Sequence, residues 1–318
     1  MKIKRFFLIF LATMLAACGS RKGRNAFQSA QYRIAYNVLA DPETDDYEIL
    51  TMNLDGSDKK NVTNHPGLEW TYYAYRDKIL FISDRDTCRR CYFLYEMDAD
   101  GENVRKASGT RLADSWMSGR NNGAELIATP HRSVDSAFYI LNKQGEVLDK
   151  LYTGLPYSGD PLFVNGGKQV VFRGGLTKSK LIDGFNEELY LINVDGTGRR
   201  QLTHYPEGDT TAGQFGYHAG TPVEHPTERF ISYQSKQNGK YSLYAVTLDG
   251  KKHWKLTDTP QNEGWHAWSP DGRWLAIELF DDDQSQFHIG LMDWQTKEMK
   301  ILTDTTYQYQ QAPVFVAP

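Results

Sequence analysis

The chain has 318 residues, of which 24% are charged and 40% hydrophobic, a balance typical of a globular protein and not of a disordered one. Its formal net charge is only −4 and its basic residues are scattered, so the composition excludes a nucleic-acid footprint and we expect no nucleic-acid partner. Aromatic residues make up 13%, with 19 Tyr and 7 Trp, and favour β-strands because flat rings pack well on a pleated surface.

The first residues have the pattern of an export signal. MKIKRFF supplies positive charge, FFLIFLATMLAA is a short apolar run, and LAAC ends it with small residues before a cysteine. The run is too short to span a bilayer as a stable helix, so residues 1–17 are predicted to be a signal peptide. A plain signal peptide and an uncleaved anchor are both alternatives to a lipoprotein signal.

The end of this signal resembles the lipobox of bacterial lipoproteins. The resemblance implies that Cys18 is acylated and that its lipid holds the protein on a membrane of the bacterial cell envelope, where we expect the outer membrane. Residues 18–31, which include GSRKGRNAFQSAQ, are predicted to be a tether between this lipid and the folded domain.

The two remaining cysteines lie close together in DRDTCRRCYF. A redox motif would need a βαβ pattern around it, and a zinc site would need a second CxxC, and the chain has neither. In an exported protein the spacing favours a small disulfide between Cys88 and Cys91 that closes the loop.

Near copies of one turn recur along the chain. The glycines of five copies are 45, 44, 51 and 54 positions apart, and they are Gly56, Gly101, Gly145, Gly196 and Gly250. A period of 40 to 50 residues indicates an array of supersecondary units. Between the turns, apolar residues alternate as in strands, for example in KILFISD followed by YFLYEMD. We interpret the DG turns as structural and assign them no chemistry.

Each full repeat predicts four strands, which in the last copy are WHAWSP, RWLAIELF, FHIGLMD and EMKILTD. Four antiparallel strands bury both faces only against neighbouring sheets, so the repeats predict an all-β, six-bladed propeller of four-stranded blades over residues 32–318. The first blade begins at YRIAYNV without an inner strand, and the C-terminal QQAPVFVAP fits that strand. We therefore expect the C-terminal strand to complete the first blade and to close the ring.

The stretches ILFISDRDTCRRCYFLYEMDADGENVRKAS and WHAWSPDGRWLAIELF resemble the repeats of the TolB-type six-bladed propeller, and the likeness covers the chain after the tether. Such repeats serve periplasmic binding proteins, peptidase propellers and carbohydrate lyases, so the resemblance implies a fold more than a function. TolB itself carries a further N-terminal domain, for which residues 18–31 leave no room, and this difference argues against its role in translocation.

The loops from the second to the third strand of each blade share one face with the loops between blades. Three loops on this face depart from the repeat, and they are RGGLTKSKLIDGFNEE, THYPEGDTTAGQFGYHAGTP and TDTPQNEGWHAWSP. Because propeller ligands bind over the channel on variable loops, we expect a monomer whose channel mouth binds a glycan or an envelope protein. The expected ligand contacts are Trp265, Tyr217, Glu263 and Lys180.

Two neighbouring blades carry a second resemblance. GYHAGTPVEHPTERFISYQS followed by EGWHAWSPDGRWLAIEL is similar to oligogalacturonate lyases, propeller enzymes that hold a divalent metal with histidines and a glutamine. The resemblance implies an alternative function as a metal-dependent polysaccharide (uronate) lyase. The metal, Mn or Ca, would be held by His218, His266 and Gln214.

In such an enzyme the metal would withdraw charge from a uronate carboxylate and so acidify the proton beside it. His204 would act as the base that starts β-elimination, and Arg173 or Lys180 would neutralise a second carboxylate. The histidines would otherwise only form hydrogen bonds, and this alternative stays open at the level of the sequence.

Overall fold

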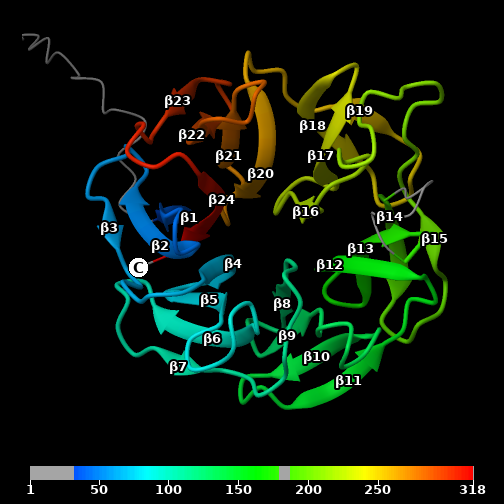
Figure 1. Ribbon diagram of the computed structural model, residues 1–318. Helices are drawn as coiled ribbons and strands as arrows, with labels where there is room; N and C mark the ends of the chain where they lie inside the picture. Colours follow the sequence, from blue (N-terminus) through cyan, green and yellow to red (C-terminus); the bar gives the residue numbers. More distant parts are fainter. Residues whose placement is uncertain (1–31, 179–186, 318) are drawn as a thin grey trace, which may run out of the picture.

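The structure, a computed structural model, describes residues 32–178 and 187–317. Every regular element in these ranges is a β-strand, and the strands form six four-stranded antiparallel sheets. Figure 1 shows the sheets arranged radially around a central axis. The predicted all-β, six-bladed propeller is therefore confirmed. Within the described residues, no helix has the length and apolar character needed to cross a membrane.

The four strands of each blade follow one another from the channel outwards. The first and second blades contain β24 (Gln310–Val316), β1 (Arg33–Asp41), β2 (Asp46–Asn53) and β3 (Lys60–Asn61), then β4 (Glu69–Tyr75), β5 (Lys78–Ser83), β6 (Phe93–Asp98) and β7 (Arg105–Lys106). The third and fourth contain β8 (Ser118–Arg120), β9 (Glu125–Ala128), β10 (Phe138–Asn142) and β11 (Val147–Leu151), then β12 (Tyr157–Val164), β13 (Gln169–Gly175), β14 (Glu187–Asn193) and β15 (Arg200–Gln201). The fifth and sixth contain β16 (Val223–Glu224), β17 (Ile231–Gln237), β18 (Lys240–Val246) and β19 (His253–Lys255), then β20 (Asn262–Trp268), β21 (Trp274–Phe280), β22 (Phe287–Asp293) and β23 (Met299–Ile301).

The two ends of the propeller close the ring, as the sequence predicts. β24 pairs antiparallel with β1, and Ile34 lies opposite Phe315. In Figure 1 the C-terminal strand lies nearest the axis, beside β1. Because each blade then has a neighbour on both sides, the inner strands have no exposed sheet faces.

Burial in the strands follows from packing between blades. All seven residues of β21 are buried, because its sheet packs against neighbours on both faces. In contrast, all three residues of the outer strand β19 are exposed.

The turns also contact the adjacent blade. Gly101 has a φ of 92°, and a Cβ atom there would lie 2.4 Å from the carbonyl oxygen of Val62. A side chain at this turn would clash with the backbone, which accounts for the glycine.

The fifth blade departs from this regularity at its inner edge. β16 has only two residues, and the chain before it runs beside β17 through isolated backbone bonds. The Lys236 N–H donates to the Tyr217 carbonyl at 2.9 Å, and the Gly220 N–H donates to the Gln234 carbonyl at 2.8 Å. Part of the long connection from β15 to β16 therefore lies beside β17 in place of a regular inner strand.

Candidate functional site

A cavity of about 600 Å³ opens beside this irregular edge, between the fifth and sixth blades. Its wall comes from the β15–β16 connection, from β17, β20 and β21, and from the beginning of β24. We call it the mouth cavity. Its volume is in the range of small-molecule binding sites.

A second cavity, of about 410 Å³, adjoins the mouth cavity. The two share the lining residues Trp265, Gln284, Phe287 and Gln311, so together they cross the channel mouth. The second cavity adds Asp114 and Arg90 from the opposite side. The Tyr72 hydroxyl donates to the Asp114 carboxylate. Although water reaches Asp114, the surrounding protein displaces much of its hydration and so raises the pKa of its carboxyl.

Aromatic rings from four blades form the floor of this mouth. Trp265 lies edge-on to Trp70 and to Trp116, with ring centroids 6.1 and 6.2 Å apart. Tyr47 and Tyr72 extend the group, since each lies 4.8 Å from a tryptophan ring. Such packing fixes the ring planes and leaves Trp265 half-buried, with part of its surface toward the cavity.

Glu278 lies on β21 at the wall of the mouth cavity and is 4% exposed. Its Oε2 accepts a hydrogen bond from the Ala312 N–H at 3.1 Å. Burial raises the pKa of this carboxyl from 4.5 to about 8, so it is mostly protonated at neutral pH. Sequence reasoning missed this residue. Its one signal is a charged residue inside the otherwise apolar strand WLAIELF.

The structure brings three of the predicted site residues together. Trp265, Tyr217 and Gln214 all line the mouth cavity, although they come from different segments. Trp265 is on β20, whereas Gln214 and Tyr217 are on the β15–β16 connection. Lys180 and Cys18 lie outside the described residues.

Arg173 has a different environment from the expected one. It is buried, and its guanidinium lies 2.7 Å from Asp160 Oδ2 and 2.9 Å from Glu187 Oε2. Its Cζ lies 5.1 Å from the centroid of the Tyr217 ring. Because two carboxylates already compensate its charge, Arg173 supports the wall of the mouth and does not offer a free cation to a ligand.

Glu263 and His204 do not line the mouth cavity either. Glu263 is fully buried, and its oxygens accept bonds from the N–H groups of Leu243 at 2.8 Å and Thr259 at 2.9 Å. It therefore holds the turn before β20 in place. His204 is exposed, with its Nδ1 3.1 Å from Gln201 Nε2.

The predicted metal ligands do not form one donor set. His218 stacks on the Tyr205 ring, with centroids 3.9 Å apart. His266 Nε2 lies 2.7 Å from Ser232 Oγ, and burial lowers the pKa of this histidine to about 3. His266 lines a separate cavity of about 420 Å³ further along the channel, whereas Gln214 lines the mouth cavity.

No group of three or more His, Cys, Asp or Glu in residues 32–178 and 187–317 is arranged to hold a metal ion. The residues present therefore do not fit the metal that the lyase resemblance implies, and we derive no catalytic step from it.

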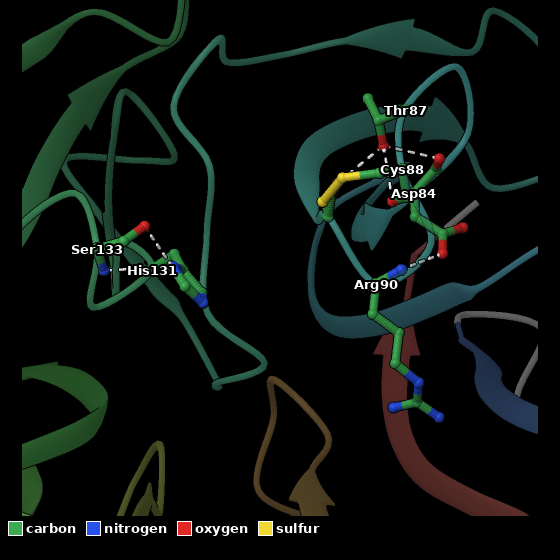
Figure 2. The surroundings of a disulfide bond; sticks show 7 residues. Asp84, Thr87, Cys88, Arg90, His131 and Ser133 are labelled. Carbon is green, nitrogen blue, oxygen red and sulfur yellow. Dashed lines mark hydrogen bonds between the residues drawn. A yellow bond between two sulfur atoms is a disulfide. The ribbon is translucent and has the colours of Figure 1, made fainter.

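A disulfide joins Cys88 and Cys91 in the loop between β5 and β6, with the Cα atoms 5.2 Å apart. Figure 2 shows this loop, in which the Arg90 N–H donates to Asp84 Oδ2 at 2.7 Å. The Arg90 side chain points away from the disulfide in this view and lines the second cavity. The bridge thus restrains a loop that contributes to the mouth. Figure 2 also shows His131 bonded to Ser133, within its own turn.

Comparison with known proteins agrees with this architecture. The model of the TolB beta propeller domain family matches residues 71–318, so the chain belongs to that family. A search of curated protein sequences finds no match.

Solved structures resemble the whole ring at low identity. A putative TolB from Agrobacterium tumefaciens is 17% identical, with a TM-score of 0.62 over 86% of this chain and 89% of that one. A chain of a nidogen/laminin complex is 11% identical, with a TM-score of 0.63 over 89% of this chain and 98% of that one. An oligogalacturonate lyase in complex with manganese is 14% identical, with a TM-score of 0.50 over 80% and 70% of the two chains. At these identities the likeness shows the fold alone.

Proposed function

We propose that the protein is a lipid-anchored protein of the bacterial cell envelope that binds a glycan in the mouth cavity. The observation that carries this proposal is the combination of Trp265 with the amide side chains of Gln214, Gln284 and Gln311 around one concave space. Sugars bury their C–H faces against aromatic rings and direct their hydroxyl groups to amides and carboxyls.

The shape of the site favours a glycan over a protein partner. The mouth is a recess between blades, and its large aromatic rings lie mostly within the recess, with Phe215 the strongly exposed exception at 67%. A protein interface of standard size is larger and flatter than such a cavity. Binding of an envelope protein is therefore the less favoured hypothesis, and the binding test below distinguishes it from glycan binding.

The anchor is supported by the lipobox-like LAAC sequence, which places Cys18 directly after a short apolar run. Metabolic labelling with an alkyne fatty acid tests this part. The label should be incorporated by the natural chain and lost in Cys18→Ser; labelling of the variant would contradict the anchor.

Ligand binding is tested by titrating the purified protein with oligosaccharides and following tryptophan fluorescence and heat. Trp265→Ala should weaken binding by about tenfold or more, because it removes a stacking ring. Trp254→Ala is the matched control, since Trp254 lies on the outer strand β19. Equal affinity for the two variants would contradict the mouth cavity as the binding site. If no oligosaccharide bound and a pull-down from envelope extracts recovered one protein, the result would favour a protein partner.

The lyase alternative has weaker support, because its proposed base and metal ligands are spread over different environments. A separate assay tests it, in which the purified protein is incubated with uronate oligomers and the ultraviolet absorbance is followed. An increase in absorbance would reveal an unsaturated product and would favour the enzyme.

A further inference from the structure

Two buried polar side chains face the mouth cavity from neighbouring blades. Gln234 on β17 is 3% exposed and Glu278 on β21 is 4% exposed, and both line the cavity. Neither was expected from the sequence, because each lies inside a core strand. Buried polar groups are normally hydrogen-bonded, so their partners indicate what the cavity is built to receive.

The side-chain oxygen of Gln234 accepts no hydrogen bond within the described residues. This atom, Oε1, is buried. The backbone closes tightly over this side chain, since a Cβ atom at Gly220 would lie 2.4 Å from Gln234 Cγ. The amide is therefore held in place, and a hydroxyl group that donates to Oε1 would supply the missing bond.

Glu278 is held in a similar way. A Cβ atom at Gly264 would lie 2.5 Å from Glu278 Oε1, so this glycine permits the close approach of β20 to the carboxyl. The groups that bond to the carboxyl are the Ala312 N–H and the Gln311 side chain, and in the described part of the chain no basic side chain accompanies them. A protonated carboxyl in this position can both donate to a ligand hydroxyl and accept from one.

The basic side chains at and behind the wall of the cavity contact other side chains of the protein. Of the residues that the structure describes, Lys236 is the one basic residue that lines it, and its Nζ lies 5.6 Å from the centroid of the Tyr241 ring. Arg173 is paired with Asp160 and Glu187. An acidic sugar that contacted Glu278 would bring a second carboxyl group to a place where the described residues supply no adjacent cation.

We propose that Gln234 and Glu278 form a recognition site for an uncharged sugar residue, whose hydroxyl groups bond to both side chains while an aromatic ring of the cavity stacks on it. This proposal rests on the proposed function and specifies its ligand class. The proposed ligand is a neutral sugar, whereas the lyase resemblance implies a uronate.

The experiment compares neutral and acidic probes by calorimetric titration of the purified protein. The neutral probes are tetramers of glucose, xylose, mannose and galactose, and the acidic probe is tetragalacturonate. At least one neutral tetramer should bind about tenfold more tightly than the acidic one. If no probe binds, the proposed function itself fails. If tetragalacturonate binds more tightly than every neutral tetramer, only the preference for an uncharged sugar is overturned.

Two substitutions test the residues themselves. Gln234→Met keeps the size of the side chain and removes the hydrogen bond, so the affinity for the neutral tetramer should fall about tenfold. Glu278→Gln keeps an uncharged group that can donate and accept hydrogen bonds, so at neutral pH it should lose less affinity than Gln234→Met. Unchanged affinity in Gln234→Met would overturn the assignment. Circular dichroism and thermal unfolding of both variants show whether they fold.

The pH dependence of binding tests whether Glu278 contacts the ligand, because a residue with only a structural role would not change it. The other titratable groups facing the cavity are Lys236, Tyr217 and Tyr241, while His266 on β20 bonds to Ser232. Burial raises the pKa of both tyrosines, so they stay neutral through the range in which Glu278 ionises. Between about pH 6 and about pH 9 the natural protein should lose affinity, and Glu278→Gln should lose less. Parallel pH profiles would overturn the role of Glu278.

Discussion

Arg33 at the beginning of β1 lies directly opposite Val316 at the end of β24, in the antiparallel pair that joins the two ends of the propeller. The residues of β24 are almost all buried, so this pairing also fills the inner edge of the first blade. The ring therefore depends on one strand that comes from the far end of the chain.

Removal of residues 310–318 should destabilise the whole ring. The deletion exposes the edge of β1 and uncovers apolar side chains of the first and sixth blades, and we expect the melting temperature to fall by about 10 °C or more. Differential scanning calorimetry measures this change. A synthetic peptide of residues 310–318 should restore most of the loss, whereas the same peptide with Val314→Asp and Phe315→Asp should not. An unchanged melting temperature after truncation would contradict closure as a source of stability.

The sequence predicted the ring because its information is local and repeated. Five of the six blades carry a glycine in the turn before their outer strand, namely Gly56, Gly101, Gly145, Gly196 and Gly250. These turns and the alternating pattern of the strands can be recognised without knowledge of distant contacts. The orphan strand at the C-terminus was sufficient to predict closure, because one blade lacked its inner strand.

The site was less predictable because it depends on which way individual side chains point. Glu263 and Trp265 are two residues apart on β20. The Glu263 carboxylate nevertheless bonds to the turn before this strand, whereas the Trp265 ring lines the mouth cavity. A register shift between Glu263 and His266 breaks the simple alternation of this strand. Gln234 and Glu278 meet one cavity from two blades, and this proximity has no signal in a single sequence.

Loss of the Arg173 guanidinium should be strongly destabilising. Arg173→Met would leave the buried carboxylates of Asp160 and Glu187 without their counter-ion, and we expect the free energy of unfolding to fall by about 3–5 kcal/mol. Urea unfolding at neutral pH measures the change. Arg105→Met is the matched control, because the Arg105–Glu96 pair is on the surface and should contribute less than about 1 kcal/mol.

A further variant separates the lost charge from the lost packing. Adding Asp160→Asn and Glu187→Gln to Arg173→Met removes both unpaired carboxylates, so part of the stability should return. If Arg173→Met were no more destabilising than Arg105→Met, the ion triad would have no structural role.

Divalent metal should have little effect on the protein. His266 is buried and bonded to Ser232, and His218 stacks on Tyr205, so the two rings are engaged elsewhere. We expect neither EDTA nor millimolar Mn²⁺ or Ca²⁺ to move the melting temperature by more than about 1 °C, since a ligand stabilises only in proportion to its binding. A rise in melting temperature with Mn²⁺ that disappears in His218→Ala, but persists in the exposed control His253→Ala, would restore the metal site.

Glu278 should make the stability of the folded protein fall as the pH rises toward 8. Burial raises the pKa of its carboxyl from 4.5 to about 8, so between these values the folded chain holds a proton that the unfolded chain has released. Unfolding then releases a proton, and each pH unit costs about 1.4 kcal/mol of stability. Glu278→Gln removes this dependence, and its stability relative to the natural protein should increase by about 3 kcal/mol between about pH 5 and about pH 8.

Urea unfolding of Glu278→Gln and of the natural protein across this pH range measures the difference between their stabilities. The contributions of the other titrating groups cancel in this difference.

Glu125→Gln is the control, because the pKa of Glu125 is shifted in the opposite direction from that of Glu278. The Arg120 side chain lowers the pKa of Glu125, so the contribution of Glu125 is present above its ordinary pKa and is lost only as the pH falls below it. The difference between Glu125→Gln and the natural protein should therefore stay constant from about pH 6 to about pH 8, where Glu125 is ionised in both states. A difference for Glu278→Gln that stayed equally constant would mean that Glu278 is ionised in the folded protein, and it would remove the neutral carboxyl on which recognition of an uncharged sugar depends.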